Sequence, residues 1–246
     1  MNQQKLKKYE ADYSGLPFED VLRKYRQQNI LNILAANKPA TILEIGSGPF
    51  PLFNTFNEFE KMLIVEPGES FYQQTKAYAG ADERITVIND FFENVVDGLL
   101  PRTFDFIIIG GFLHEINNPD EVLQAVKKLC HRHTIVHSFV PNANSFHRLL
   151  AYEMGLIKDV YEKSLHDELF QRQQVYNMDS FQQLFINNNL KIASSGSYFF
   201  KPFTNSQMAA IASAGIIGNA VMDGLDQVIK YFPANGAELF INSLLA

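Results

Sequence analysis

The sequence predicts an α/β fold in three layers, with seven strands in one sheet. Short apolar runs of strand length recur along the chain, and helical segments separate most of the early ones. The run Thr41–Ile45 leads directly into a glycine-rich turn. Strands that alternate with helices favour a mainly parallel sheet, because a parallel neighbour needs a long crossover connection.

The glycine turn after residues 41–45 has the features of a nucleoside-binding site. Gly46 and Gly48, with Ser47 between them, let the backbone bend sharply and bring bare N–H groups against a ligand. Glu44 adds a carboxylate that would favour a cationic ligand over a pyrophosphate. A dinucleotide fingerprint needs a glycine at position 51, where this chain has Pro51, so a nicotinamide-dependent oxidoreductase is the weaker alternative.

Each of the next two predicted strands is followed by an acid. The strand Lys61–Val65 leads into Glu66, which lies about 20 residues beyond the turn, where nucleoside-binding sheets hold a ribose diol. The strand Arg84–Ile88 leads to Asp90, which could alternatively cap the turn over residues 91–96. Ligands of open α/β sheets bind at the carboxyl ends of the strands, so both acids are expected near the glycine turn.

The remaining elements continue the same pattern. The strand Phe104–Ile109 ends in Gly110 and Gly111, and a helix is expected from Pro119 to about His131. Helices are expected between the first five strands, and an N-terminal helix precedes them. The predicted N-terminal helix and the last three strands span Phe18–Ala36, Thr134–Val140, Leu190–Phe200 and Ala237–Leu244.

Residues 41–50 resemble motif I of the class I S-adenosylmethionine (SAM)-dependent methyltransferases, E/D-x-G-x-G-x-G. Glu44, Gly46 and Gly48 match the motif, and Phe50 replaces its third glycine. The layout of seven strands is similar to the Rossmann-like sheet of that family, and this resemblance implies that the last strand runs antiparallel to its neighbours. The resemblance implies that S-adenosyl-L-methionine is the cofactor, that Asp90 accepts from the adenine amino group, and that Phe91 packs against the ring. The cofactor-binding residues that it implies are Glu44, Gly46, Ser47, Gly48, Glu66, Pro67, Asp90, Phe91, Gly110 and Gly111.

Residues 141–148 and 176–181 resemble small-molecule methyltransferases of the quinone and polysaccharide-biosynthesis type. The expected reaction is therefore O-methylation of a sugar, a nucleotide-sugar or a quinone-like metabolite. A non-catalytic module that binds SAM or another nucleoside is the alternative, since every cofactor-facing feature is common to both.

An aliphatic hydroxyl acceptor is weakly acidic and needs a base, and histidine is the natural candidate. His114, His147 and His166 are the candidate catalytic residues, because they follow the fourth strand or lie in the insertion that would cover the acceptor. His137 is expected to be buried structure, and His131 and His133 are expected at a helix end. Glu115 with His114 could begin a metal site, but nearby acids for the remaining ligands are not evident, so no metal is predicted. Candidates to touch the cofactor carboxylate or the acceptor are Tyr13, Tyr25 and Arg26.

The chain is expected to form a single domain over residues 1–246. An N-terminal helical cap covers residues 1–36, an acceptor-lid insertion covers 142–189, and a second helical insertion covers 204–231. The second insertion contains the uncharged stretch Met208–Met222, whose 15 residues are too few to span a bilayer. This stretch is expected to pack as one or two helices against the domain or against a second subunit, as in a homodimer.

The composition of the chain limits the classes of partner that are expected to bind it. The net charge of −6 and the pI near 5.5 argue against nucleic acid as a partner and leave a small-molecule acceptor. The basic cluster at residues 5–8 is expected to be a solvated tail. Cys130 is the one cysteine, so an intrachain disulfide is excluded, and no apolar signal core is visible at the N-terminus. These features predict a cytoplasmic enzyme with no membrane association.

Overall fold

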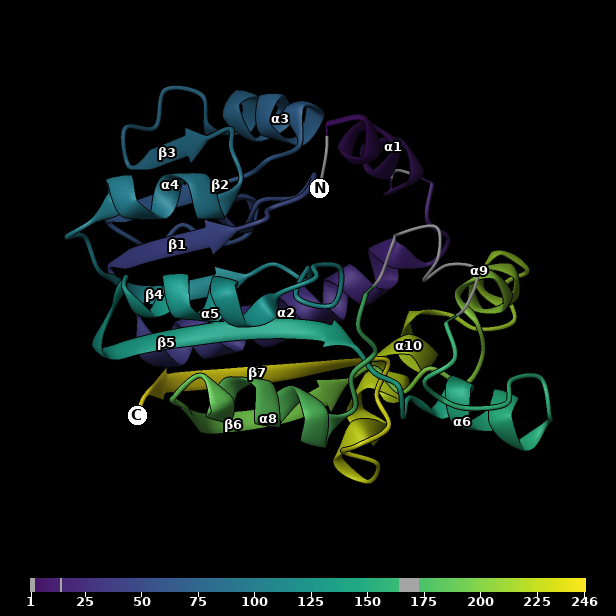
Figure 1. Cartoon of the computed structure of the whole chain (residues 1–246). Coiled ribbons are helices and arrows are strands. Elements are labelled where there is room, and N and C mark those ends of the chain that lie inside the picture. Colours follow the sequence, from purple (N-terminus) through teal and green to yellow (C-terminus); the bar gives the residue numbers. More distant parts are fainter. Residues whose placement is uncertain (1–2, 14, 164–172) are drawn as a thin grey trace.

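The computed structural model describes residues 3–13, 15–163 and 173–246, and it joins seven strands in one sheet (Figure 1). The strand order is β3-β2-β1-β4-β5-β7-β6, and β7 runs antiparallel to both of its neighbours. The predicted seven-stranded sheet with an antiparallel last strand is therefore confirmed. The strands are β1 (Thr41–Ile45), β2 (Lys61–Val65), β3 (Ile85–Ile88), β4 (Phe104–Ile109), β5 (Cys130–Pro141), β6 (Leu190–Tyr198) and β7 (Glu238–Leu245).

Helices precede, connect and follow these strands. Two of the described helices begin at residues whose side chains satisfy free N–H groups of the first turn: Asn177 and Thr204 each form a capping box with the third helical residue. The helices in the described ranges are α1 (Gln3–Tyr13), α2 (Glu19–Asn37), η1 (Leu52–Asn54), α3 (Glu69–Ala79), α4 (Phe92–Leu99), α5 (Pro119–Lys127), α6 (Phe146–Glu153), α8 (Met178–Asn187), α9 (Asn205–Ser213), α10 (Asn219–Gln227) and η2 (Val228–Lys230).

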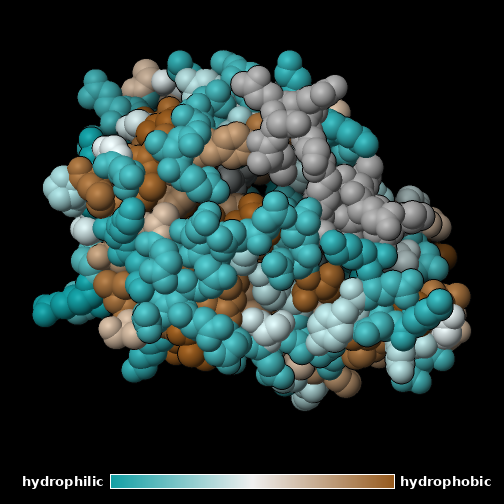
Figure 2. All heavy atoms as spheres, viewed as in Figure 1, coloured by the Kyte–Doolittle hydropathy of each residue, from teal (hydrophilic) through white to brown (hydrophobic). Residues whose placement is uncertain are grey.

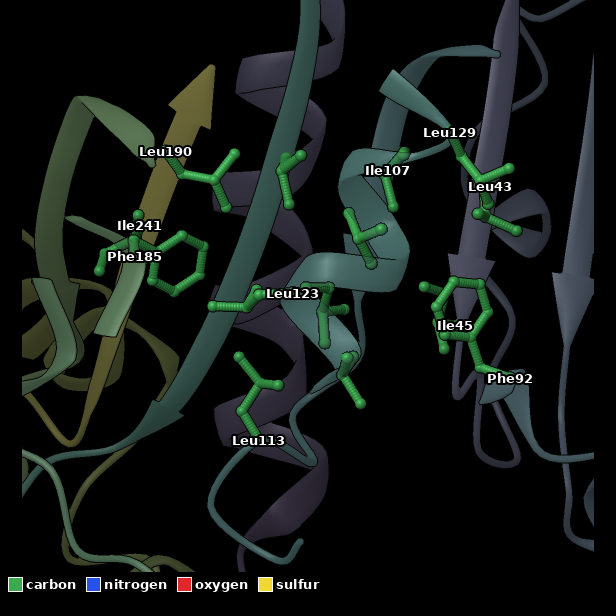
Figure 3. Packing of buried hydrophobic residues seen from close by; sticks show 14 of the residues in the cluster. Leu43, Ile45, Phe92, Ile107, Leu113, Leu123, Leu129, Phe185, Leu190 and Ile241 are labelled. Atoms are coloured by element: carbon green, nitrogen blue, oxygen red, sulfur yellow. The ribbon is translucent and has the colours of Figure 1, made fainter. Parts of the chain in front are cut away.

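Alternate residues of the central strands face two separate hydrophobic cores. On one face, Leu43 and Ile45 of β1 pack with side chains from α4, α5 and α8. On the other face, Ile42 packs with side chains from α2 and the segment around η1. Figure 1 shows α4, α5 and α8 in front of the sheet and α2 behind it, and in Figure 3 Phe92 lies near Ile45 while Phe185 lies near Ile241. Period-two alternation within buried parallel strands produces this three-layer arrangement.

The register of the parallel strands brings four strand ends to one level. Ile45 of β1 pairs with both Val65 of β2 and Ile109 of β4, and Val65 pairs with Ile88 of β3. The residues that follow these ends therefore emerge at the same edge of the sheet. This edge carries the glycine turn together with Glu66, Asn89 and Gly110.

The connection between β1 and β2 differs from the prediction. A helix was expected between these strands, but the structure has only the short 3-10 helix η1. Pro49 and Pro51 remove two N–H donors just where a first helical turn would form. The expected helical layer is replaced by the packing of Leu52, Phe56 and Phe59 in the second core.

The boundary between α5 and β5 is also wrong in the prediction. The helix ends at Lys127 and β5 begins at Cys130, so His131 and His133 lie in a strand and not at a helix end. β5 gains these residues because Cys130 pairs with Phe104 of β4, and the ring of His131 lies 3.1 Å from Asp105 Oδ1. Such cross-strand partners are distant in sequence, and the polar residues 131–133 gave no strand signal.

The basic cluster at residues 5–8 is part of α1 and is not a solvated tail. Leu6 is buried and the side chains of Lys7 and Lys8 are exposed, which is the pattern of a helix with one covered face. The Glu10 carboxylate accepts hydrogen bonds from the backbone N–H of Ser70 at 2.8 Å and from its hydroxyl at 2.7 Å. Because these groups belong to the first turn of α3, Glu10 caps that helix from α1.

The insertions form helices at one end of the sheet (Figure 1). Met208–Met222 is divided between α9 and α10, and both methionines pack on Phe18 and Leu22 near α2. Within residues 142–189, α8 belongs to the sheet core through Phe181 and Phe185, so the predicted acceptor lid now concerns residues 142–177.

Within the described ranges, no helix combines the length and the apolar content that crossing a bilayer requires. Hydrophilic residues dominate the face in Figure 2, and hydrophobic residues reach it in separate groups.

Candidate functional site

A cavity of about 270 Å³ lies at the carboxyl edge of the sheet, over β1, β2, β4 and β5 and beneath α1 and α2. Most of the predicted site residues line it. Asp90 and His147 are not among the lining residues, and His166 lies outside the described residues. The predicted residues that the cavity brings together are Glu44, Gly46, Ser47, Gly48, Glu66, Pro67, Phe91, Gly110, Gly111 and His114.

The glycine turn adopts the conformation for which its glycines are needed. Gly46 and Gly48 have φ angles of 76° and 56°, in the left-handed region that side chains disfavour. Their N–H groups are not bare, in contrast to the expectation. Gly46 N–H donates to the Val65 carbonyl and Gly48 N–H donates to Glu66 Oε2, each at 2.9 Å. The end of β2 therefore holds the turn in place, and a ligand would meet its carbonyls, side chains and open surface.

Two buried carboxylates face this turn. Glu44 accepts from the Leu52 N–H at 3.1 and 3.3 Å, and burial raises the pKa of Glu44 to about 8, with a smaller contribution from the charge of Glu66. Glu66 Oε1 accepts from the Gly68 N–H at 2.8 Å, and burial raises the pKa of Glu66 to about 7 despite its backbone hydrogen bonds. Both groups carry a proton more readily than ordinary carboxyls, and a nearby cation would favour their ionised forms.

The predicted adenine end of the cavity is mainly aromatic. Phe91 and Phe92 line it together with Glu93. Asp90 instead accepts from the Phe91 N–H at 2.7 Å and from the Asn94 side chain at 2.6 Å. These bonds tie Asp90 to residues at the start of α4, but the N-cap of that helix is Phe91, which has no side-chain cap. A role of Asp90 toward adenine stays a prediction.

The loop after β4 forms the opposite wall. A Cβ atom on Gly110 would collide with the carbonyl of Gly46, and one on Gly111 would lie 2.5 Å from the Phe139 ring, so both positions exclude side chains. His114 is 4% exposed, and its Nε2 lies 3.6 Å from Glu115 Oε1. The His114 carbonyl accepts from the N–H groups of Gln173 and Gln174, which ties this loop to the returning end of the insertion.

Of the three N-terminal residues that were predicted to touch the cofactor carboxylate or the acceptor, two line the cavity. Tyr13 and Arg26 line the cavity, as expected of groups that could touch the cofactor or the acceptor. Arg26 donates to both carboxylate oxygens of Glu238, at 2.6 and 2.9 Å, and to Glu19 at 3.0 Å. Tyr25 is not part of the lining, because its hydroxyl donates to Asp223 and its ring stacks on Phe199.

Sequence reasoning missed Arg23, Phe50 and Glu238. The Arg23 guanidinium lies 3.4 Å from the centre of the Phe50 ring, and both residues line the cavity. Two signals could have indicated them. Arg23 lies one helical turn before Arg26 on the same face, and Phe50 is the one departure from the glycine motif. Glu238 had no such signal, since only the pairing of β7 with β5 brings it to the site.

The other histidines are distributed across the structure. His137 is fully buried in β5, its Nδ1 lies 2.8 Å from Asn242 Oδ1, and burial lowers the pKa of His137 to about 4, so its predicted structural role is confirmed. His147 lies on α6, outside the lining. Within the described part of the chain, no group of three histidine, cysteine or acidic residues is placed to hold a metal ion.

No protein-family profile matches the sequence, and no curated protein matches it. Solved structures do match. The plantazolicin methyltransferase BamL, in complex with a triazolic desmethylPZN analog and SAH, is 15% identical with a TM-score of 0.58, and the alignment covers 98% of this chain and 97% of that one. The chain has the class I methyltransferase fold.

Two further methyltransferases show the same fold at low identity. A SAM-dependent methyltransferase from Archaeoglobus fulgidus is 12% identical with a TM-score of 0.57, covering 90% of this chain and 94% of that one. The N-methyltransferase NodS from Bradyrhizobium japonicum WM9 is 9% identical with a TM-score of 0.54, covering 92% and 97%. The predicted Rossmann-like methyltransferase sheet is therefore confirmed at the level of the fold.

Proposed function

We propose that the protein is a SAM-dependent methyltransferase that acts on a small-molecule acceptor. The observation that carries the proposal is the single cavity at the sheet edge, which joins the glycine turn, two buried carboxylates and a buried histidine. The fold alone does not carry it, because one fold can host many functions. The charges of the site support it, since the carboxylates at the ends of β1 and β2 suit a cationic nucleoside better than a pyrophosphate.

The residues of the cavity fit the parts of S-adenosylmethionine. Glu66 is the proposed partner of the ribose hydroxyls, because its Oε1 accepts from the Gly68 N–H and retains a second lone pair. Its Oε2 accepts from the Gly48 N–H and, at 3.4 Å, from the Ser47 hydroxyl. Phe91 and Phe92 offer apolar faces to the adenine ring. Glu44 lies beside the glycine turn, where its carboxylate would attract the positive charges of the cofactor.

The proposed reaction is transfer of a methyl group to a hydroxyl oxygen. S-adenosylmethionine, when bound, supplies an electrophilic methyl group attached to a sulfonium. His114 is the proposed general base, which takes the proton of the acceptor hydroxyl at an imidazole nitrogen while the new oxygen–carbon bond forms. The glycines after β4 let the backbone approach closely, and the cavity walls position the reactants and limit water. Sugars, nucleotide-sugars and quinone-like metabolites remain the proposed acceptors.

Calorimetry with S-adenosylhomocysteine tests the proposal directly. The wild-type protein should bind S-adenosylhomocysteine and should not bind NAD. Glu66→Ala should weaken binding by roughly tenfold, because a hydrogen bond to a charged group contributes on the order of 1.5–3 kcal/mol. Glu69→Ala is the matched control, since Glu69 lies three residues further on and its side chain contacts Gln73 on the surface.

Tighter binding of NAD than of S-adenosylhomocysteine would contradict the proposal. An unchanged affinity in Glu66→Ala would remove that residue from the site. Turnover of S-adenosylmethionine with a panel of hydroxyl acceptors then separates an enzyme from a non-catalytic nucleoside-binding module.

A further inference from the structure

Helix α2 presents two arginines to the cavity, one turn apart. Arg23 and Arg26 both line the wall beside the glycine turn, and both are carried by the same face of the helix. A cofactor with an amino-acid end brings a carboxylate into a cavity whose other described charged lining residues are glutamates. The two arginines are therefore the cations among the described lining residues that could receive it.

Arg26 is already engaged. Its Nε and Nη2 donate to the two carboxylate oxygens of Glu238, and Nη2 also donates to Glu19. The side chain is only 11% exposed, so this cluster is largely removed from water. A ligand carboxylate could reach the guanidinium only by displacing a buried bidentate pair and leaving Glu238 without its partner, which is strongly unfavourable.

Arg23 has a different environment. Its Nη2 contacts Asp20 at 2.7 Å, and Asp20 is 84% exposed, so water can replace this contact. Its Nε is buried, and no group in the described part of the chain accepts a hydrogen bond from it. A buried N–H without an acceptor is unfavourable, so an acceptor delivered by a ligand would relieve that cost.

Phe50 fixes the position of this guanidinium. The ring lies 3.4 Å beneath the guanidinium carbon of Arg23, which is a close cation–π contact. Position 50 is where the motif that this turn resembles has its third glycine. The replacement gives the turn a flat aromatic surface on which the arginine lies, so the departure from the motif and the arginine on α2 form one unit.

We infer that Arg23 binds the carboxylate of the amino-acid end of the cofactor and that Phe50 is its positioning residue. Arginine suits this role because its planar donors match the two oxygens of a carboxylate. Glu44, which lines the same cavity, would meet the positive charges of the same ligand. The inference rests on the proposed function, and it adds that the site distinguishes nucleosides with a carboxylate from those without one.

A comparison of two ligands in two proteins isolates this contact. S-adenosylhomocysteine and its decarboxylated form, S-adenosyl-3-thiopropylamine, differ only in the carboxylate, and calorimetry measures both with wild-type protein and Arg23→Met. The variant should lose about tenfold to a hundredfold in affinity for S-adenosylhomocysteine, the range expected for a charged hydrogen bond. Its affinity for the decarboxylated ligand should equal that of the wild type.

Two further variants complete the test. Phe50→Leu should show a smaller loss that also disappears with the decarboxylated ligand, because it only loosens the guanidinium. Arg26→Met should weaken both ligands equally or neither. Equal losses for the two ligands in Arg23→Met, or a loss confined to the carboxylate ligand in Arg26→Met, would overturn the inference. If wild-type protein binds no S-adenosylhomocysteine, the proposed function itself fails, which is a different result.

Discussion

Binding of S-adenosylmethionine should tighten as the pH rises from 6 to 8. The change in pH alters the ionisation of Glu44 and Glu66, because burial raises their pKa values to about 8 and about 7 in the ligand-free protein. At low pH both groups are protonated and offer no charge to a cation. A ligand that needs the ionised form therefore binds only the fraction of molecules that has lost the proton.

The magnitude follows from the ionised fractions. With a pKa of about 8, roughly one hundredth of Glu44 is ionised at pH 6 and one half at pH 8, which allows a gain in affinity of about fiftyfold. Glu66, with a pKa of about 7, can add up to about tenfold in the same direction. S-adenosylhomocysteine lacks the sulfonium charge, so its affinity should rise less.

Stability should change in the opposite sense in the ligand-free protein. Both carboxyls have folded-state pKa values above their model value of 4.5, so the folded protein holds more protons than the unfolded chain between these values. The free energy of unfolding therefore falls as the pH rises from about 4.5 through the folded-state values. A bound cation would offset this loss, and the stabilisation by S-adenosylmethionine should grow with pH.

Calorimetry at three pH values, in buffers of different ionisation enthalpy, measures both the affinity and the protons released on binding. Glu44→Gln should bind with a much flatter pH dependence and release fewer protons. An affinity for S-adenosylmethionine that is constant or falls between pH 6 and pH 8 would refute the reasoning, because it would mean that neither carboxylate interacts with the positive charge.

Three further predictions concern the base, the N-terminal helix and the core. His114→Gln should lower turnover by about 10² with little change in affinity for S-adenosylhomocysteine, and His147→Gln provides the comparison; wild-type turnover in both variants would exclude base catalysis by either residue. Glu10→Ala removes the cap that α1 places on α3 and should speed dissociation of S-adenosylhomocysteine several-fold in stopped-flow measurements. Lys8→Ala on the exposed side of α1 should not, and identical rates in the two variants would show that α1 does not retain the ligand. Phe185→Ala, at a fully buried position in α8, should lower the free energy of unfolding by about 3–5 kcal/mol in denaturant titrations without affecting ligand affinity; a small loss would mean that α8 is not part of the core.

The sequence predicted most of the elements because their signals are local. β1, β2 and β4 have the predicted bounds, since each is a mainly apolar run that is followed by a glycine or an acid. Two of the errors fall where distant segments determine local structure. β5 begins early because Cys130 pairs with Phe104, and α1 is ordered in part because Glu10 bonds to Ser70.

The features of the candidate site also separate into those that the sequence determines and those that depend on tertiary structure. The sequence by itself determined the glycine turn, Glu44 near the end of β1, Glu66 after β2, and the glycines and histidine after β4. These groups meet because strand ends in a parallel sheet gather at one edge whatever the details of packing. Only the tertiary structure decided how these groups are used. It directed Asp90 to the Phe91 N–H and the Gly48 N–H to Glu66, and it joined Arg26 to Glu238 across more than two hundred residues. Hydrogen bonds and ion pairs depend on the positions of atoms to within a fraction of an ångström, and residues so far apart in the chain reach those positions only when the whole sheet has formed.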